Sequence, residues 1–164
     1  MIQKVLNVAI VAMLTLAVTA TAHDFTHCPG VTDELGIAAV SLSPDPVHPS
    51  CNVVVKVSGG PTEIAVSGGN ATLSLILFGS TVYRKGYDIC TEFGVSCPVP
   101  AGEKWSGQIQ QAIPKEIPTF GSIKAQVDIY NQTHILSCFT MTIALGPSGC
   151  PSLRGATNMD VQKV

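Results

Sequence analysis

Histidine is the residue type most able to bind a metal or move a proton near neutral pH. The sequence contains four histidines, His23, His27, His48 and His134, and none of them falls in a zinc-ligand spacing. If the chain were cleaved before His23, the new α-amine and the His23 imidazole could bind Cu(II) together with His27 or His134. A copper enzyme is therefore one hypothesis. It requires that cleavage position and a second histidine brought close by folding.

The sequence carries no other recognisable catalytic signature. No Gly-rich phosphate loop follows a strand pattern, and there is no GxSxG motif. The acidic residues Asp33, Glu34, Asp88 and Glu92 do not form an obvious acid/base pair. Asp88 is better suited to capping a turn. We therefore expect a protein that is not an enzyme, with no catalytic residue, no metal and no cofactor.

The stretch from Tyr87 to Val99 holds two cysteines, and the elements around it must position them. Cys90 and Cys97 lie seven positions apart with Gly94 between them, so they can close a small disulfide loop without straining the backbone. Strand patterns lead into this stretch and leave it. We expect a Cys90–Cys97 disulfide that staples a corner between two strands, which is called the stapled corner below.

Apolar residues alternate with polar residues along several segments from Val40 onward, and no segment shows helical periodicity. Turns rich in Gly and Pro separate these segments. The pattern predicts an all-β, antiparallel β-sandwich of about seven strands. The two clearest apolar faces are formed by Leu73, Leu75 and Leu77 and by Ile123, Val127 and Ile129.

The first 22 residues have the pattern of a secretory signal peptide: Lys4, an apolar run from Val5 to Val18, and Ala20-Thr21-Ala22 as a cleavage site. We expect residues 23–145 to form one domain and residues 146–164 a C-terminal tail. All six cysteines follow the cleavage site, which fits an oxidising compartment and up to three disulfides. The protein is thus expected to be secreted or lumenal (extracellular, vacuolar or lysosomal).

The net charge and the sequons predict which partners and modifications the protein has. The formal net charge is −2, and no basic stripe is present, so we expect no nucleic-acid partner. Two sequons, at Asn70 and Asn131, predict glycosylation on exposed loops.

Five motifs occur in an order that resembles the ML lipid-recognition family. They are Cys28, Val40-Ser41-Leu42-Ser43-Pro44-Asp45-Pro46, the stapled corner, Ile113-Pro114-Lys115-Glu116-Ile117-Pro118 and Cys138. The resemblance covers about Cys28 to Ala144, and is greatest to the phosphatidylglycerol/phosphatidylinositol transfer protein type. The Niemann–Pick type C cholesterol carrier is a more distant relative.

The resemblance implies an immunoglobulin-like sandwich whose sheets splay apart around one phospholipid or sterol. The protein would carry this lipid between membranes as a monomer that contacts the membrane surface transiently. Parted sheets would turn the apolar faces into a pocket, and burying a lipid tail gains about 0.8 kcal/mol per methylene. A secreted recognition sandwich with a filled core is the competing interpretation.

The resemblance also implies that Cys28 pairs with Cys138 and Cys90 with Cys97. Cys51 and Cys150 then remain, and Cys51–Cys150 is the third disulfide that we expect. An exchange of partners, Cys28–Cys150 and Cys51–Cys138, stays open.

The expected lipid-binding residues are the two apolar faces and a rim around the mouth of the pocket. The rim residues lie in segments where turns and prolines prevent regular pairing: Val82, Tyr83, Ile113, Ile117 and Phe120. The alternative is that Ile117 and Phe120 plug the end of a solid core.

Overall fold

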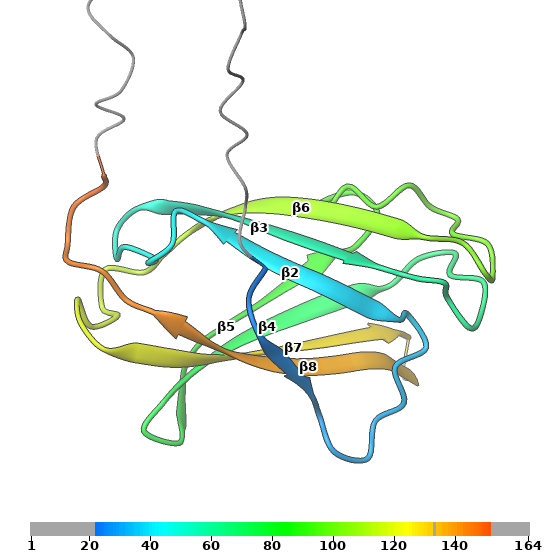
Figure 1. The fold of residues 1–164 in the computed structure, drawn as a ribbon, viewed down its shortest axis with the longest axis horizontal. Helices are drawn as coiled ribbons and strands as arrows, with labels where there is room; N and C mark the ends of the chain where they lie inside the picture. The colour runs from blue at the N-terminus through cyan, green and yellow to red at the C-terminus, as the bar shows by residue number, and fades with distance from the viewer. Residues whose placement is uncertain (1–21, 133, 152–164) are drawn as a thin grey trace, which may run out of the picture.

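The computed structural model describes residues 22–132 and 134–151 and shows two β-sheets packed face to face (Figure 1). The antiparallel sandwich expected from the alternating pattern is confirmed. No helix in the described residues is long and apolar enough to cross a membrane. The strands are β1 (Phe25–His27), β2 (Ile37–Ser43), β3 (Asn52–Gly59), β4 (Asn70–Leu77), β5 (Ser80–Asp88), β6 (Trp105–Ala112), β7 (Ser122–Asn131) and β8 (His134–Ala144).

The larger sheet has five strands in the order β1-β8-β7-β4-β5, and the smaller has three in the order β2-β3-β6. All neighbouring strands are antiparallel. The sequence predicted about seven strands because β1, only three residues long, is too short to show alternation. Strand β5 extends to Asp88 and so enters the stapled corner.

The register of the larger sheet brings the expected apolar faces together. Leu75 of β4 lies opposite Ala125 of β7, and Leu73 lies opposite Val127. Val127 in turn lies opposite Phe139 of β8, which is fully buried. Because these residues share one side of the pleated sheet, they form a continuous apolar surface that faces the smaller sheet.

The two sheets are tied together by backbone along the side where β1 and β2 lie. The His23 N–H donates to the Val40 carbonyl at 2.7 Å, and Ala22 forms a β-bridge with Ser41. At one end of this side, the Val47 N–H donates to the Ala144 carbonyl at 3.0 Å. On the opposite side, β5 and β6 are the outermost strands of their sheets and are not paired with each other.

Three disulfides are formed: Cys28–Cys138, Cys51–Cys150 and Cys90–Cys97. Cys51–Cys150 is the third disulfide that we expected, and the exchanged pairing does not occur in the structure. It joins the residue before β3, in the smaller sheet, to the chain beyond β8, in the larger sheet.

Non-reducing peptide mapping of the purified protein should recover these three linked pairs and no free thiol, because each pair already has its Cα atoms 5.3 to 5.7 Å apart. A peptide that linked Cys28 to Cys150, or Cys51 to Cys138, would contradict this pairing.

The stapled corner is ordered by Asp88, as its turn-capping role predicts. Its Oδ1 accepts the N–H groups of Cys90 at 2.9 Å and Thr91 at 2.8 Å. These bonds favour the ionised carboxylate, and the hydrogen bonds from Thr91 lower the pKa of Asp88 most. The corner then reaches β6, because the Gln108 N–H donates to the Phe93 carbonyl at 2.8 Å.

The two sequon asparagines lie at strand ends and not in loops. Asn70 is the exposed first residue of β4, and Asn131 is the half-buried last residue of β7.

Candidate functional site

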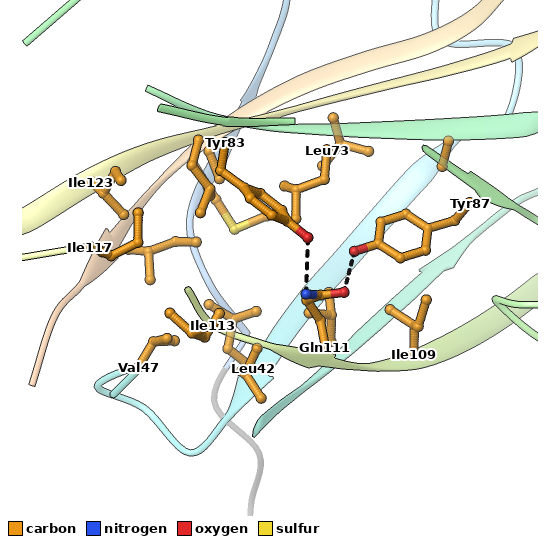
Figure 2. Close-up of a pocket in the computed structure, with 18 of the residues that line it drawn as sticks. Leu42, Val47, Leu73, Tyr83, Tyr87, Ile109, Gln111, Ile113, Ile117 and Ile123 are labelled. Atoms are coloured by element: carbon orange, nitrogen blue, oxygen red, sulfur yellow. Dashed lines mark hydrogen bonds between the residues drawn. The ribbon is translucent and has the colours of Figure 1, made fainter. Parts of the chain in front are cut away.

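An apolar cavity lies between the two sheets, with an enclosed volume of about 60 Å³. The smaller sheet contributes Val53, Val55 and Ile109, and the larger sheet contributes Leu73, Leu75 and Ile123. Figure 2 shows Leu73 and Ile123 of the larger sheet and Ile109 of the smaller sheet around this space. A second apolar cavity of about 30 Å³ lies toward the stapled corner and is lined in part by Val95 and Ile129.

Most of the residues expected to bind lipid line the main cavity. They are Leu73, Leu75, Tyr83, Ile113, Ile117, Ile123 and Val127. Ile117 is 4% exposed, so this residue closes one end of the cavity and does not form an open rim.

Four expected residues are not part of the cavity wall: Leu77, Val82, Phe120 and Ile129. Leu77 is the last residue of β4 and is partly buried against the core, whereas Ile129 lines the second cavity. Val82 falls at a register shift between β4 and β5, has no partner in that ladder, and is exposed. Phe120 precedes β7 and is 79% exposed.

The cavity contains one buried polar side chain, Gln111 of β6, which the sequence analysis missed. Its Nε2 donates to the Tyr83 hydroxyl at 3.0 Å, and its Oε1 accepts the Tyr87 hydroxyl at 2.6 Å (Figure 2). Lys85 Nζ also donates to Gln111 Oε1, at 3.2 Å. Spacing could have shown only that these side chains share the inward face of their strands, since Tyr83, Lys85 and Tyr87 alternate on β5 and Gln111 alternates with Ile109 and Ile113.

Tyr87 stays protonated in this environment. Burial raises the pKa of its phenol above the usual value, and the neighbouring Tyr83 and Glu92 raise it further. Its hydroxyl is therefore a hydrogen-bond donor to Gln111 throughout the physiological pH range.

Three of the four histidines each lie beside a different carboxylate. His23 lies 3.2 Å from Asp45, and His134 lies 2.8 Å from Glu34. His27 lies 3.7 Å from a third carboxylate, that of Asp33. Within residues 22–132 and 134–151, the only group of three potential ligand atoms is Cys28, Asp128 and Cys138, and its two sulfurs form a disulfide.

Fold and cavity together define an immunoglobulin-like β-sandwich with an apolar space between its sheets. The sequence profile of the ML domain family matches residues 22–145, and the chain belongs to this family. The family resemblance seen in the sequence is confirmed.

The chain is similar to several curated phosphatidylglycerol/phosphatidylinositol transfer proteins. The putative phosphatidylglycerol/phosphatidylinositol transfer protein 3 from Dictyostelium discoideum is 24% identical to this chain over 95 residues, which cover 58% of this chain and 62% of the relative. The protein from Cryptococcus neoformans is 27% identical over 105 residues, with 61% and 58% covered. Putative protein 2 from D. discoideum is 29% identical over 139 residues, with 82% and 94% covered. The chain thus spans less than two thirds of the first two relatives.

Two solved structures share the fold. A Niemann-Pick type C2 protein from Japanese carpenter ant superposes with a TM-score of 0.59 at 17% identity, covering 74% of this chain and 98% of that one. Chicken MD-1, complexed with lipid IVa, superposes with a TM-score of 0.52 at 18% identity, covering 74% and 87%. At these identities the likeness supports the fold alone.

Proposed function

We propose that this protein is a non-enzymatic lipid carrier that holds one phospholipid or sterol between its sheets and moves it between membranes. The observation that carries the proposal is the apolar cavity, whose walls come from both sheets and include one buried polar side chain. An acyl chain or sterol needs such walls and few polar contacts. The names of the curated relatives, which specify phospholipid transfer, support the same function.

The sheets must move apart for the cavity to accept a lipid. The enclosed volume of about 60 Å³ is far below the roughly 300–1,000 Å³ of typical ligand pockets. The same small volume favours the second candidate, a recognition sandwich with a filled core. In the carrier, opening costs lost sheet-to-sheet packing, and burial of the lipid tail offsets it at about 0.8 kcal/mol per methylene.

Mass spectrometry under native conditions separates the two candidates. Protein stripped of lipid and then incubated with phospholipid vesicles should acquire the mass of one lipid per chain. A protein that returns from vesicles of phospholipid, with and without sterol, at its lipid-free mass would instead be a filled recognition sandwich.

One end of the sandwich is proposed to touch the membrane. Phe78, in the turn between β4 and β5, is 97% exposed, and Phe120, in the crossing between β6 and β7, is also exposed. Both segments lie at the same end of the molecule in Figure 1, and the second of them includes Ile117, which lines the cavity. Phe78 and Gly79 both have positive φ, and an aromatic residue is unusual at such a turn position. Two exposed aromatic rings at this end suit insertion into a bilayer surface.

Replacing both rings, as in Phe78→Ser/Phe120→Ser, should slow lipid transfer between vesicles about tenfold, because less apolar surface is then available to enter the bilayer. Equilibrium lipid binding should change little, since neither ring lines the cavity. Transfer is measured with a fluorescent phospholipid moved from donor to acceptor vesicles.

Ile64→Ser/Ile135→Ser is the matched control, since both of these isoleucines are exposed and lie outside the crossing and the β4–β5 turn. If the control slows transfer as much as the double Phe variant, general surface hydrophobicity and not this end of the sandwich governs transfer.

We also propose that the protein is secreted or lumenal, with a signal peptide before the domain and a tail after it. Three disulfides in one small domain favour an oxidising environment, hence a secreted or lumenal protein. The proposed signal peptide, 1–22, falls almost wholly outside the described residues, as does the tail beyond residue 151.

A further inference from the structure

The side of the sandwich between β5 and β6 is closed mainly by side chains. At Gln108, the stapled corner covers β6 through the backbone bond to Phe93. Beyond that point, the hydrogen bonds that cross from β6 to β5 all involve the Gln111 side chain, which bonds to Tyr83, Lys85 and Tyr87. This contrasts with the β1/β2 side, where backbone hydrogen bonds join the sheets. We call this side of the sandwich, where Tyr83, Lys85 and Tyr87 of β5 face Gln111 of β6, the slit. Because few backbone bonds cross it, the slit is the side of the sandwich that opens most readily.

Lys85 places a positive charge at this slit. It lies opposite Leu73 in the β4–β5 ladder, and its neighbours at i−2 and i+2, Tyr83 and Tyr87, both line the cavity. Its side chain turns toward the same space, since Nζ lies 3.2 Å from Gln111 Oε1 and 4.8 Å from the centre of the Tyr87 ring. Within the described residues, no carboxylate lies within ion-pair distance of Lys85. The slit thus presents a cation without a counter-charge beside an apolar cavity.

The hydrogen-bond donors at the slit also outnumber the acceptors. Gln111 is 8% exposed, and every hydrogen-bonding position of its amide is used: Nε2 donates to the Tyr83 hydroxyl and the Ala112 carbonyl, and Oε1 accepts from Tyr87 and Lys85. The Tyr83 hydroxyl accepts from Gln111, so its own proton remains available. Lys85 has two further N–H donors. A lipid headgroup that enters the slit would meet one positive charge and several hydrogen-bond donors. Phosphate and ester oxygens accept hydrogen bonds, and a phosphate also carries the opposite charge.

We propose that Lys85 and Tyr83 form a headgroup site in the slit between β5 and β6, where they bind the phosphate of an anionic phospholipid whose acyl chains occupy the cavity. Gln111 holds the slit closed in the absence of lipid. When the phosphate binds Lys85 and Tyr83, the hydrogen bonds that these two residues make with Gln111 across the slit are replaced by hydrogen bonds to the phosphate. This inference rests on the proposed function, and it selects phospholipid over sterol as the preferred cargo.

The test compares two short-chain lipids with the same acyl chains, a phosphatidylglycerol and a diacylglycerol that lacks the phosphate. Titration calorimetry on lipid-stripped protein should show that phosphatidylglycerol binds at least tenfold more tightly. Lys85→Met should remove this preference and leave diacylglycerol affinity unchanged, and Lys85→Arg should restore it. Tyr83→Phe should reduce the preference severalfold, because it removes one donor.

Arg84→Met is the matched control, because Arg84 precedes Lys85 on β5 and projects from the other side of the strand. It removes the same charge and should leave the preference for phosphatidylglycerol intact. If Arg84→Met reduces the preference as much as Lys85→Met does, general surface charge attracts the headgroup and the site is refuted.

An inward-pointing lysine on an outermost strand can also serve to prevent pairing between copies of the chain. Lys85→Gln keeps a polar group there without the charge, so it should remain a monomer on size exclusion and still lose the preference. If Lys85→Gln retains the preference, Lys85 does not bind the headgroup and the site is refuted.

Inorganic phosphate distinguishes a lipid headgroup from a free anion. Phosphate alone should not bind at concentrations at which phosphatidylglycerol saturates the protein. Comparable affinity for the two would overturn the headgroup assignment in favour of a simple anion site. Equal binding of the two lipids by the unmodified protein would refute the headgroup site while leaving the carrier function standing. If neither lipid binds, the carrier function itself fails.

Discussion

The variant Leu75→Trp is expected to lose lipid uptake by at least tenfold while the sandwich still folds. Leu75 is 4% exposed, lies in the middle of β4, and faces the cavity between Ala125 of β7 and Tyr83 of β5. The indole ring is much larger than the isobutyl group that it replaces, so it takes up the enclosed volume of about 60 Å³. A lipid tail would then have to displace the ring.

Uptake is measured as the fraction of protein that carries lipid after incubation with vesicles, and folding by circular dichroism and thermal unfolding. Ile135→Trp is the control, because Ile135 lies on β8 of the same sheet but is exposed and outside the cavity. Undiminished uptake by folded Leu75→Trp protein would show that this face does not hold the lipid. In a solid core, the same change would cost about 1–3 kcal/mol of stability through overpacking.

Removing the Cys28–Cys138 disulfide, as in Cys28→Ala/Cys138→Ala, is expected to reduce stability more than removing the short Cys90–Cys97 disulfide does. The disulfide joins residues 110 positions apart, and closing a loop of roughly this length stabilises the folded state by up to about 4.7 kcal/mol. Cys138 is also buried in β8, beside Phe139 at the centre of the core. We expect a loss of about 2–5 kcal/mol in the free energy of unfolding.

Cys90→Ala/Cys97→Ala provides the comparison, because that disulfide spans only seven positions and the same relation gives about 2.5 kcal/mol. Urea denaturation without reductant measures both variants. A loss for Cys28→Ala/Cys138→Ala no larger than that for Cys90→Ala/Cys97→Ala would mean that loop length does not determine the contribution of these disulfides.

The alternating pattern was sufficient to predict the sandwich and much of the cavity wall. Leu73, Leu75, Ile123 and Val127 were assigned to the interior because period-two alternation determines which side of a strand faces the core. The same rule cannot say how far along a strand the cavity extends. Ile129 shares the face of Val127, yet it lies far enough along β7 to line the second cavity.

Local irregularities account for other differences between expectation and structure. The register shift at Val82 and the short strand β1 depend on pairing with a neighbouring strand, which local alternation does not encode. The sequence pattern did not single out Phe78, whose ring is exposed in the structure.

The polar cluster was beyond the reach of sequence reasoning for a different reason. Gln111 belongs to the smaller sheet, while Tyr83, Lys85 and Tyr87 belong to the larger one. A strand pattern indicates that each side chain points inward, but only the packing of one sheet on the other shows that they meet. Side chains that bond across two sheets depend on tertiary structure, and sequence separation carries little information about them.

The unequal closure of the two sides of the sandwich determines how it can deform. In the proposed carrier, the backbone bonds at His23 and Val47 and the Cys51–Cys150 link would act as a hinge, and Gln111 would act as a latch on the far side. Opening is then a rotation and not a parallel separation, so atomic displacements grow with distance from the hinge. The space produced is a wedge, narrow beside Val40 and widest beside Tyr83. A wedge accommodates the two splayed chains of a diacyl lipid better than it does one rigid, flat ring system.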